Sequence, residues 1–301
     1  MTSPHRSLNR AAFLTLLLVA CMMGGNHVAA RIAFNSGLDV ATAVAVRSGV
    51  TAAVVAALIF LQGVPLAFTA RHRRVLPVIG LLVSVQSLCL YSSVARLPVA
   101  LALLAFNTYP LWTAFWAWAI YRRVPERAVL IAMPVILLGL ALALDVLGAA
   151  SGLGAAGQWA RIGAGVAFAL TAAATFGLAL VLTQHEAADV DGRVRTAITM
   201  GIVSVFALSG VWVQGGFHLP HAASGWWGLA VLTFLYGTAF TIMFTLLPKL
   251  GVVGSSPIMN VEPVFALVLA WLILGQAIAP MQLVGAALVV GAVMMLGLRR
   301  R

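Results

Sequence analysis

Long apolar runs separated by short polar segments follow one another along the whole chain. A helix needs about 20 mainly apolar residues to cross a bilayer. Ten runs reach this length: residues 11–30, 41–62, 75–95, 98–121, 128–147, 162–184, 196–214, 225–247, 252–274 and 280–298. They do not alternate between polar and apolar residues as barrel strands do. Because lipid offers the backbone no hydrogen-bond partners, the pattern predicts an all-α polytopic membrane protein with ten transmembrane helices.

Composition agrees with this class, because 62% of the residues are hydrophobic and only 8% are charged. These values lie far outside the range of soluble globular proteins. The ten spans leave no stretch long enough for a soluble domain. The first span follows Arg6 and Arg10 as a signal peptide would, but its length and the nine later spans favour an uncleaved anchor.

One stretch of the chain occurs twice. The segment 97–120, LPVALALLAFNTYPLWTAFWAWAI, corresponds to 250–273, LGVVGSSPIMNVEPVFALVLAWLI, 153 residues later. Asn107 and Pro110 align with Asn260 and Pro263, and a shared Asn-x-x-Pro inside an apolar span is not expected from composition alone. We therefore expect two five-helix repeats, residues 1–150 and 151–301.

The net charge of +11 is distributed unevenly between the loops. Fourteen cations fall on one side of the ten predicted spans: Arg6, Arg10, Arg71, Arg73, Arg74, Arg122, Arg123, Arg127, Arg193, Arg195, Lys249, Arg299, Arg300 and Arg301. Four fall on the other side or at the ends of spans there: Arg31, Arg47, Arg96 and Arg161. The positive-inside rule then predicts that both termini are cytoplasmic. The charge is an orientation signal and does not indicate a nucleic-acid partner.

Five helices in each half imply that the second half enters the membrane from the opposite side to the first. Inverted repeats of this kind recur in secondary transporters, with the substrate site near the midplane between the repeats. Two near-equivalent packings that face opposite sides of the membrane are a physical basis for alternating access.

The segment NVEPVFALVLAWLILGQ, residues 260–276, resembles the second repeat of the drug/metabolite transporter superfamily in its ten-helix EamA-type branch. Further matches are Gly24-Gly25-Asn26, Arg47 and the segment YSSVARLP at 91–98. Overall, the chain most resembles the YddG-type exporters of aromatic and other neutral amino acids. The acid that the family commonly carries after its Leu-Gly is replaced here by Gln276 and, in the first half, by Arg123.

Pro110 and Pro263 are candidate hinges. A proline inside a helix removes a backbone hydrogen bond and disturbs the carbonyl four residues earlier, and Asn107 and Asn260 lie close enough to satisfy that carbonyl or to meet a substrate. The other interpretation is a tolerated kink with an Asn that bonds between helices.

Glu262 is the only acid deep in a span, and an ionisable group there indicates function by default. It could bind a substrate ammonium, carry a proton or form a structural ion pair, for example with Arg47. His27, Arg31 and Arg47 lie toward the external ends of spans one and two and could attract a carboxylate. For Arg31, a position at the lipid headgroups is the simpler expectation.

Aromatic and polar residues could complete the walls of a substrate cavity. Tyr109, Trp112 and Trp116 share one helical stripe and could stack on an aromatic or cationic substrate. Gln86, Tyr91, Tyr236 and Thr238 could supply hydrogen bonds from the facing helices. A few polar groups in an apolar cavity suit neutral amphiphilic solutes.

The sequence therefore predicts a multi-pass transporter of the bacterial inner membrane that exports small neutral solutes, foremost aromatic and other neutral amino acids, by facilitated movement. Multidrug or quaternary-cation efflux and lipid-carrier flipping are the alternatives within this fold, and a channel or membrane scaffold is the alternative outside it. No enzymatic, metal or cofactor motif is apparent: the chain has a single lysine and therefore no Walker motif, and the histidines are scattered. The expected partners are a small-molecule substrate and the lipid bilayer, and a monomer is plausible.

Overall fold

The computed structural model describes residues 10–125, 127–149, 151–245, 261–276 and 279–299. These residues form eleven helices and no strand. In the first half the helices are α1 (Arg10–Asn35), α2 (Val40–Leu61), α3 (Ala70–Arg96), α4 (Val99–Phe106), α5 (Tyr109–Tyr121) and α6 (Arg127–Ala143). The second half contains α7 (Gly154–Glu186), α8 (Gly192–Val213), α9 (Ala223–Thr245), α10 (Glu262–Leu274) and α11 (Pro280–Arg299). The predicted all-α class is confirmed.

Seven segments of the described residues are long and apolar enough to cross a membrane, and α4 and α5 together form one of them. Three shorter apolar helices, within α6, α10 and α11, fall at the other predicted spans. Helix α7 begins at Gly154, eight residues before the predicted start of its span at 162.

The predicted single helix 98–121 is interrupted. Helix α4 ends at Phe106, and Pro110 lies in the first turn of α5. At that position the missing N–H of proline sacrifices no intrahelical hydrogen bond. The expected kink inside a continuous helix is therefore wrong, and a break between two helices takes its place.

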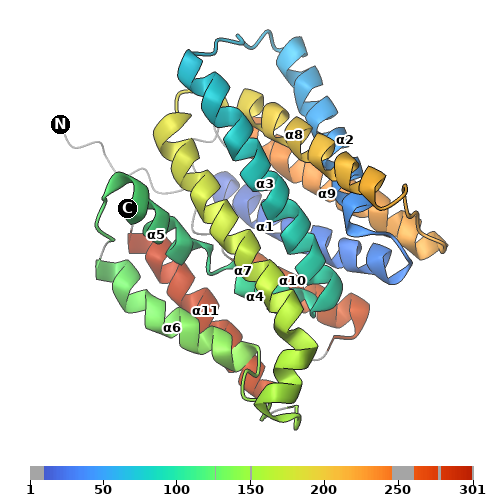
Figure 1. Cartoon of the computed structure of the whole chain (residues 1–301), viewed down its shortest axis with the longest axis vertical. Coiled ribbons are helices and arrows are strands. Elements are labelled where there is room, and N and C mark those ends of the chain that lie inside the picture. Colours follow the sequence, from blue (N-terminus) through green and yellow to red (C-terminus); the bar gives the residue numbers. More distant parts are fainter. Residues whose placement is uncertain (1–9, 126, 150, 246–260, 277–278, 300–301) are drawn as a thin grey trace.

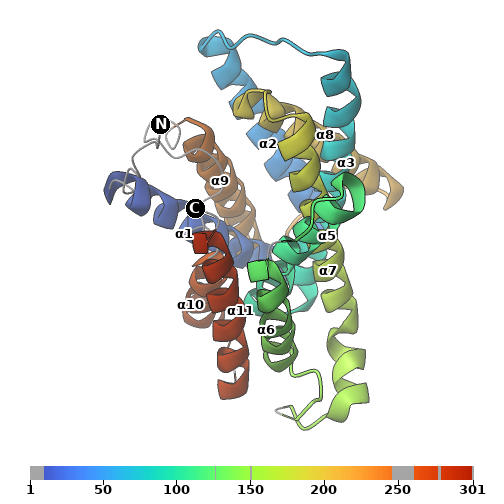
Figure 2. The same ribbon diagram turned by 90° about the vertical axis from the view of Figure 1, so that its left-hand side faces the viewer.

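Helices of the first half pack mainly against helices of the second half. The most extensive pairs are α2 with α8, α3 with α7, α1 with α9 and α6 with α11. Figure 1 shows α3 beside α7 and α6 beside α11, and Figure 2 shows α6 beside α11 from the side. The two halves are therefore interlocked and do not form two separate bodies.

The most extensive helix pairs are kept when the two halves are exchanged. A shift of 153 residues makes both bounds of α5 coincide with those of α10. The same shift places α1, α2, α3 and α6 on α7, α8, α9 and α11. Under this exchange, the α1–α9 pair becomes α7–α3, and α1–α10 becomes α7–α5. The α2–α8 and α6–α11 pairs become themselves. This is the pairing that a pseudo-two-fold axis between the halves produces.

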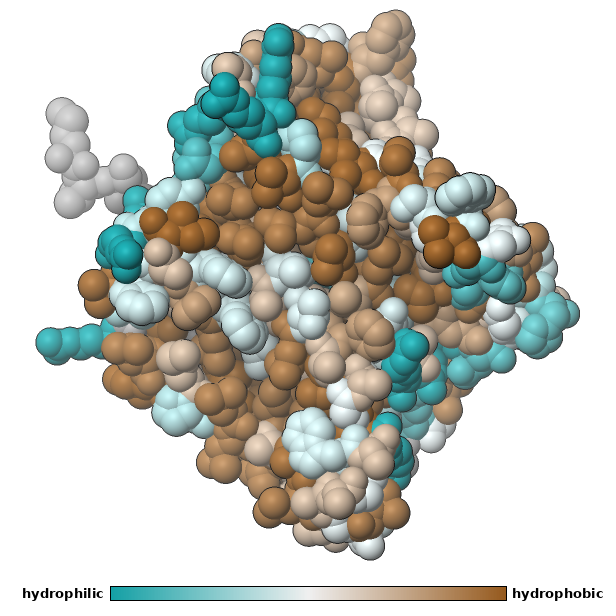
Figure 3. All heavy atoms as spheres, viewed as in Figure 1, coloured by the Kyte–Doolittle hydropathy of each residue, from teal (hydrophilic) through white to brown (hydrophobic). Residues whose placement is uncertain are grey.

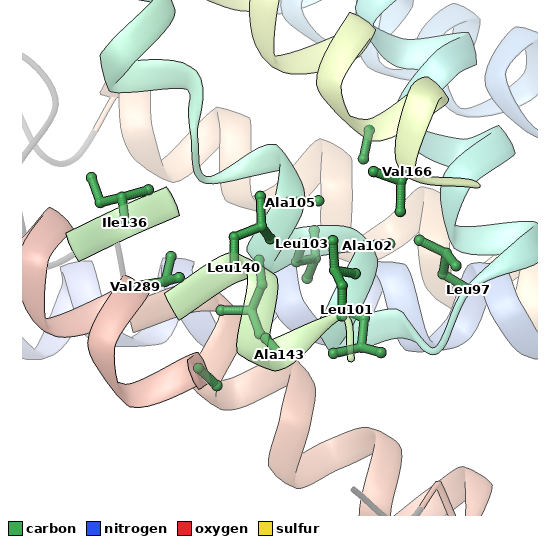
Figure 4. Packing of buried hydrophobic residues seen from close by; sticks show 14 of the residues in the cluster. Leu97, Leu101, Ala102, Leu103, Ala105, Ile136, Leu140, Ala143, Val166 and Val289 are labelled. Atoms are coloured by element: carbon green, nitrogen blue, oxygen red, sulfur yellow. The ribbon is translucent and has the colours of Figure 1, made fainter. Parts of the chain in front are cut away.

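A buried apolar cluster fills the space around the short helix α4. Figure 4 shows Leu101, Leu103 and Ala105 of this helix packed near Leu140 of α6. All residues of α4 except Phe106 are buried. The outer surface is also apolar: hydrophobic residues cover most of the face in Figure 3, and Phe60 and Trp212 are more than 80% exposed. An apolar core inside an apolar surface is the arrangement expected of a protein surrounded by lipid.

Candidate functional site

The first element of the site is a close approach between α1 and α10 at Gly24. A methyl group on Gly24 would lie only 2.9 Å from the backbone nitrogen of Ala266 and 3.1 Å from the carbonyl oxygen of Glu262. Glycine has no Cβ, so the two backbones can pack this closely. One turn further along α1, the imidazole of His27 therefore faces the first turn of α10.

His27 and Glu262 form the acid–base pair of the site. The Nε2 atom of His27 lies 3.3 Å from Oε1 of Glu262, and the His27 side chain is almost completely buried whereas that of Glu262 is 21% exposed. The predicted pairing of Glu262 with Arg47 is wrong, because the ion-pair partner of Glu262 is His27. The direction in which each side chain leaves its helix decides the partner, and depth in the membrane alone does not determine it.

Arg47 is held between two aromatic rings. Its guanidinium carbon lies 4.4 Å from the ring centre of Tyr91 on α3 and 3.9 Å from that of Tyr236 on α9. The residue is 2% exposed. A desolvated cation over an aromatic face gains about 2 kcal/mol or more. These contacts hold a full positive charge inside the bundle and join α2, α3 and α9 at one point.

Tyr91 lies between Arg47 and the His27–Glu262 pair and contacts Arg47 and His27. Its hydroxyl donates a hydrogen bond of 2.8 Å to Oδ1 of Asn26, and its ring centre lies 5.5 Å from that of His27. We call the set Asn26, His27, Arg47, Tyr91, Tyr236 and Glu262 the Tyr91 cluster. It brings together five predicted site residues from five helices, α1, α2, α3, α9 and α10. Asn26 was not predicted as a site residue, although an amide beside a histidine inside an apolar span was a visible signal.

The glycine contact is repeated in the other half. Gly177 of α7 corresponds to Gly24, and a methyl group on it would lie 2.8 Å from the backbone nitrogen of Thr113 on α5. Thr113 corresponds in turn to Ala266. The exchange of halves therefore holds for individual residues as well as for whole helices.

The model of the EamA-like transporter family matches the chain twice, over residues 10–144 and 163–298. This chain belongs to the EamA-like transporter family. Members of the family are membrane transporters of small solutes and not enzymes. The family match and the apolar helices together identify a multi-pass membrane protein. Within the described residues, no group of three or more His, Cys, Asp or Glu side chains could hold a metal ion.

One solved structure, titled "Crystal structure of protein", is similar to this EamA-like transporter over 95% of the chain and 98% of its own length. The TM-score is 0.60 and the sequence identity is 20%, so the likeness concerns the fold alone. No curated protein matches the chain.

The predicted aromatic stripe of this EamA-like transporter lies on the interface between α5 and α7. Tyr109 packs against Phe176, with ring centres 5.2 Å apart, and Nε1 of Trp116 donates a hydrogen bond of 3.0 Å to the carbonyl of Ala174. Trp112 lies against Gly177. The exchange of halves places Tyr109 at the position that Glu262 occupies in α10. The stripe therefore corresponds to the α1–α10 side of the Tyr91 cluster, with aromatic rings in place of charges.

Asn107 satisfies the backbone at the break between α4 and α5. Its Nδ2 donates a hydrogen bond of 2.9 Å to the carbonyl of Leu103, and not to the carbonyl of Phe106 that Pro110 was expected to disturb. Pro263 lies in the first turn of α10 as Pro110 does in α5. Asn260 lies outside the described residues. The hinge role of the two prolines stays a prediction.

The remaining predicted residues make other contacts. Oε1 of Gln86 accepts a hydrogen bond from Ser87 on its own helix. Thr238 lines an apolar groove of about 640 Å³ between α2 and α9. Arg31 donates a hydrogen bond of 2.7 Å to the carbonyl of Val94, so its guanidinium ties α1 to α3. The headgroup position expected for it stays a prediction.

Proposed function

We propose that this chain is a secondary transporter of the bacterial inner membrane that exports aromatic and other neutral amino acids by alternating access. The observation that carries the proposal is the pair of opposite charges beside Tyr91: the buried cation Arg47 and the partly exposed acid Glu262. A zwitterion carries the matching pair of charges and is neutral overall. Burial strengthens each of these interactions relative to water.

The exchange of halves supports the alternating-access part of the proposal. Two halves with equivalent packing can form equivalent states that open to opposite sides, provided that they are inverted in the membrane as the loop charges predict. The break before Pro110 and the first turn at Pro263 are the places where the short helices could pivot. We infer facilitated movement, with both termini in the cytoplasm.

Efflux of quaternary cations is the second candidate. The aromatic rings of Phe106, Tyr109 and Phe176 favour it, because their ring centres lie between 5.2 and 5.6 Å apart and aromatic faces attract cations. Against it stands Arg47, which repels a second positive charge in the Tyr91 cluster.

Flux measurements with purified protein in proteoliposomes test the proposal. We expect labelled phenylalanine or threonine to move in a saturable, temperature-sensitive manner that liposomes without protein do not show. Flux of tetraphenylphosphonium without amino-acid flux would support cation efflux. Amino-acid flux that does not saturate would indicate a channel. Either result would contradict the proposal.

A further inference from the structure

The Tyr91 cluster contains donors without acceptors. Nε of Arg47 and Nδ2 of Asn26 are buried and have no hydrogen-bond partner. Arg47 is 2% and Asn26 0% exposed. Buried polar groups in proteins are nearly always paired, so each exception calls for an explanation. Nδ1 of His27 is the third such atom in the cluster. The other two flank the same ring, because Arg47 stacks on Tyr91 and Asn26 accepts the hydroxyl hydrogen bond of Tyr91.

Arg47 also has no carboxylate partner in the part of the chain that the structure describes. The ion pairs found there involve His27, Arg71, His72, Arg193 and His218 as the basic partners. Glu262, the acid of the cluster, is paired with His27. Two tyrosine rings are the main neighbours of the guanidinium. They stabilise its charge through their faces, and the Nε–H donor of Arg47 has no acceptor, so this donor stays available.

The guanidinium group of arginine matches the planar geometry of a carboxylate. The five N–H donors of arginine form a planar fork that bonds both oxygens of a carboxylate. A side-chain amide beside that fork can add one further donor. Stacking of the guanidinium between two rings fixes its plane in advance, which lowers the entropy cost of binding.

We propose that Arg47, oriented by Tyr91 and Tyr236 and assisted by Asn26, binds the carboxylate of the transported substrate. This inference rests on the proposed function and adds to it the group by which the substrate is recognised. The Arg47 subsite selects molecules that carry a carboxylate and disfavours amines and amides of the same shape. Glu262, which contacts His27 and is partly exposed, accepts the ammonium of a neutral amino acid.

Competition against labelled phenylalanine in proteoliposomes tests the subsite in the unaltered protein. Three analogues separate the charges: 3-phenylpropionate keeps only the carboxylate, phenethylamine keeps only the ammonium, and phenylalaninamide replaces the carboxylate with an amide. We expect 3-phenylpropionate to compete. Phenethylamine and phenylalaninamide should reach half-maximal inhibition only at concentrations at least about tenfold higher than 3-phenylpropionate does, as the loss of a charge-assisted hydrogen bond predicts. Equal competition by phenylalanine and phenylalaninamide would overturn the inference.

Substitutions at Arg47 then assign the preference to this residue. We expect Arg47→Gln to raise the KM for phenylalanine by about tenfold or more and to bring the phenylalanine-to-phenylalaninamide preference close to one. Arg96→Gln is the matched control, because Arg96 bonds only the carbonyl of Ser92 on its own helix and stacks on Phe168. It should leave the preference unchanged. A preference that survives in Arg47→Gln would contradict the subsite.

Two further measurements keep the test decisive. If Arg47→Gln does not fold, as judged by gel filtration, Asn26→Ala replaces it and should lower the carboxylate preference in part. If no amino acid moves at all, the proposed function fails. The subsite is then tested alone, by titration of 3-phenylpropionate and phenethylamine against the purified protein. Binding of the amine in preference to the acid would overturn it.

Discussion

At the scale of single residues, the contact between His27 and Glu262 joins α1 to α10 where the backbones are closest. Glu262 keeps part of its carboxylate accessible, so one oxygen can hold the imidazole while the other meets a substrate. The two charges of the Tyr91 cluster thus have different surroundings. Arg47 is covered by rings, whereas Glu262 is open on one side.

Glu262→Gln should weaken amino-acid binding without making transport dependent on pH. Glutamine preserves the shape and can still bond His27, but it cannot neutralise an ammonium. We expect the KM for phenylalanine to rise about tenfold, the cost of one charge-assisted hydrogen bond. The measurement is initial flux in proteoliposomes between pH 5.5 and 8. A pH dependence in the unaltered protein that disappears in Glu262→Gln would show proton coupling and contradict facilitated movement.

Asp191 allows a second prediction at this scale. The side-chain hydrogen bonds from Arg193 lower the pKa of this carboxyl, and Nη2 of Arg193 lies 2.7 Å from its Oδ2. A lowered pKa means that the ionised form is favoured by folding. The stabilisation is therefore complete above the unfolded value of about 3.9 and is lost as pH falls through the folded pKa.

Asp191→Asn keeps an N-cap side chain and removes only the charge. We expect it to lower the melting temperature slightly at pH 7, in line with about 0.2–1 kcal/mol for an exposed pair. The difference should shrink below about pH 4 and vanish once the pH is below the folded pKa. Thermal unfolding of the purified protein at several pH values measures it. A difference that persists at low pH would mean that the pair is not its source.

Most residues of the Tyr91 cluster could be predicted one by one from the sequence. A charge or a histidine inside an apolar span is unusual whatever surrounds it, so His27, Arg47 and Glu262 were visible. That these side chains lie in one cluster could not be predicted, because it depends on how five helices are rotated about their axes. Arg47 and Glu262 have suitable depths to pair, yet Arg47 points between two rings and Glu262 toward α1.

At the scale of helices, the contacts at Gly24 and Gly177 set how closely α1 approaches α10 and α7 approaches α5. In Gly24→Ala and Gly177→Ala, the new methyl groups would meet backbone atoms at 2.9 and 2.8 Å. Backbone cannot move aside as a side chain can, so the helices must separate. We expect each substitution to destabilise the protein by about 1–3 kcal/mol.

Gly201→Ala in α8 is the control, since a methyl group there meets no atom within 4 Å. It should be neutral or stabilising by up to about 1 kcal/mol, because alanine favours helix more than glycine does. Thermal unfolding of the three variants in the same detergent makes the comparison. Equal stability of Gly24→Ala and Gly201→Ala would show that the close approach is not needed.

The break between α4 and α5 leads to a prediction about rate. Pro110→Ala removes the steric obstacle to a continuous helix through residues 107–109 and should stiffen the hinge. We expect a several-fold lower turnover with little change in KM, and the same for Pro263→Ala. Proteoliposome flux at saturating substrate measures turnover. Pro134→Ala, a proline inside α6, should have no such effect. Unchanged turnover in both hinge variants would contradict the hinge role.

The sequence could not distinguish a kinked helix from two helices at this point. A proline in the first turn and a proline inside a helix look the same in an apolar run, and the polar pair Asn107-Thr108 is compatible with either arrangement. The deciding interaction is local: Asn107 and Thr108 bond back to the carbonyls of Leu103 and Ala105 and end α4 there.

At the scale of the whole molecule, the repeat predicted from Asn-x-x-Pro has a counterpart in the packing of almost every described helix. The short helix α4 is the exception, since its counterpart at 252–259 lies outside the described residues. The division at residue 150 and the cytoplasmic position of the termini stay predictions, because the helix packing carries no information on which side of the membrane a loop lies.

Accessibility of single cysteines tests the orientation. With Cys21 and Cys89 replaced by alanine, Asp189→Cys probes the α7–α8 loop and His218→Cys the α8–α9 loop. The loop charges predict that His218→Cys reacts with an impermeant maleimide in intact cells, whereas Asp189→Cys reacts only after permeabilisation. The reverse pattern would invert the proposed topology.

The interlocking of the halves has a consequence for how the protein is made. A ribosome delivers the chain from its N-terminus, so α1, α2, α3 and α6 enter the bilayer before α7, α8, α9 and α11, their most extensive partners, have been synthesised. During that interval Arg47 has Tyr91 on one side but still lacks Tyr236 on the other. The nascent first half must therefore wait in lipid with an incompletely covered charge. Until the second half is inserted, the stability of the first half therefore depends on the membrane insertion machinery and not on the contacts of the finished fold.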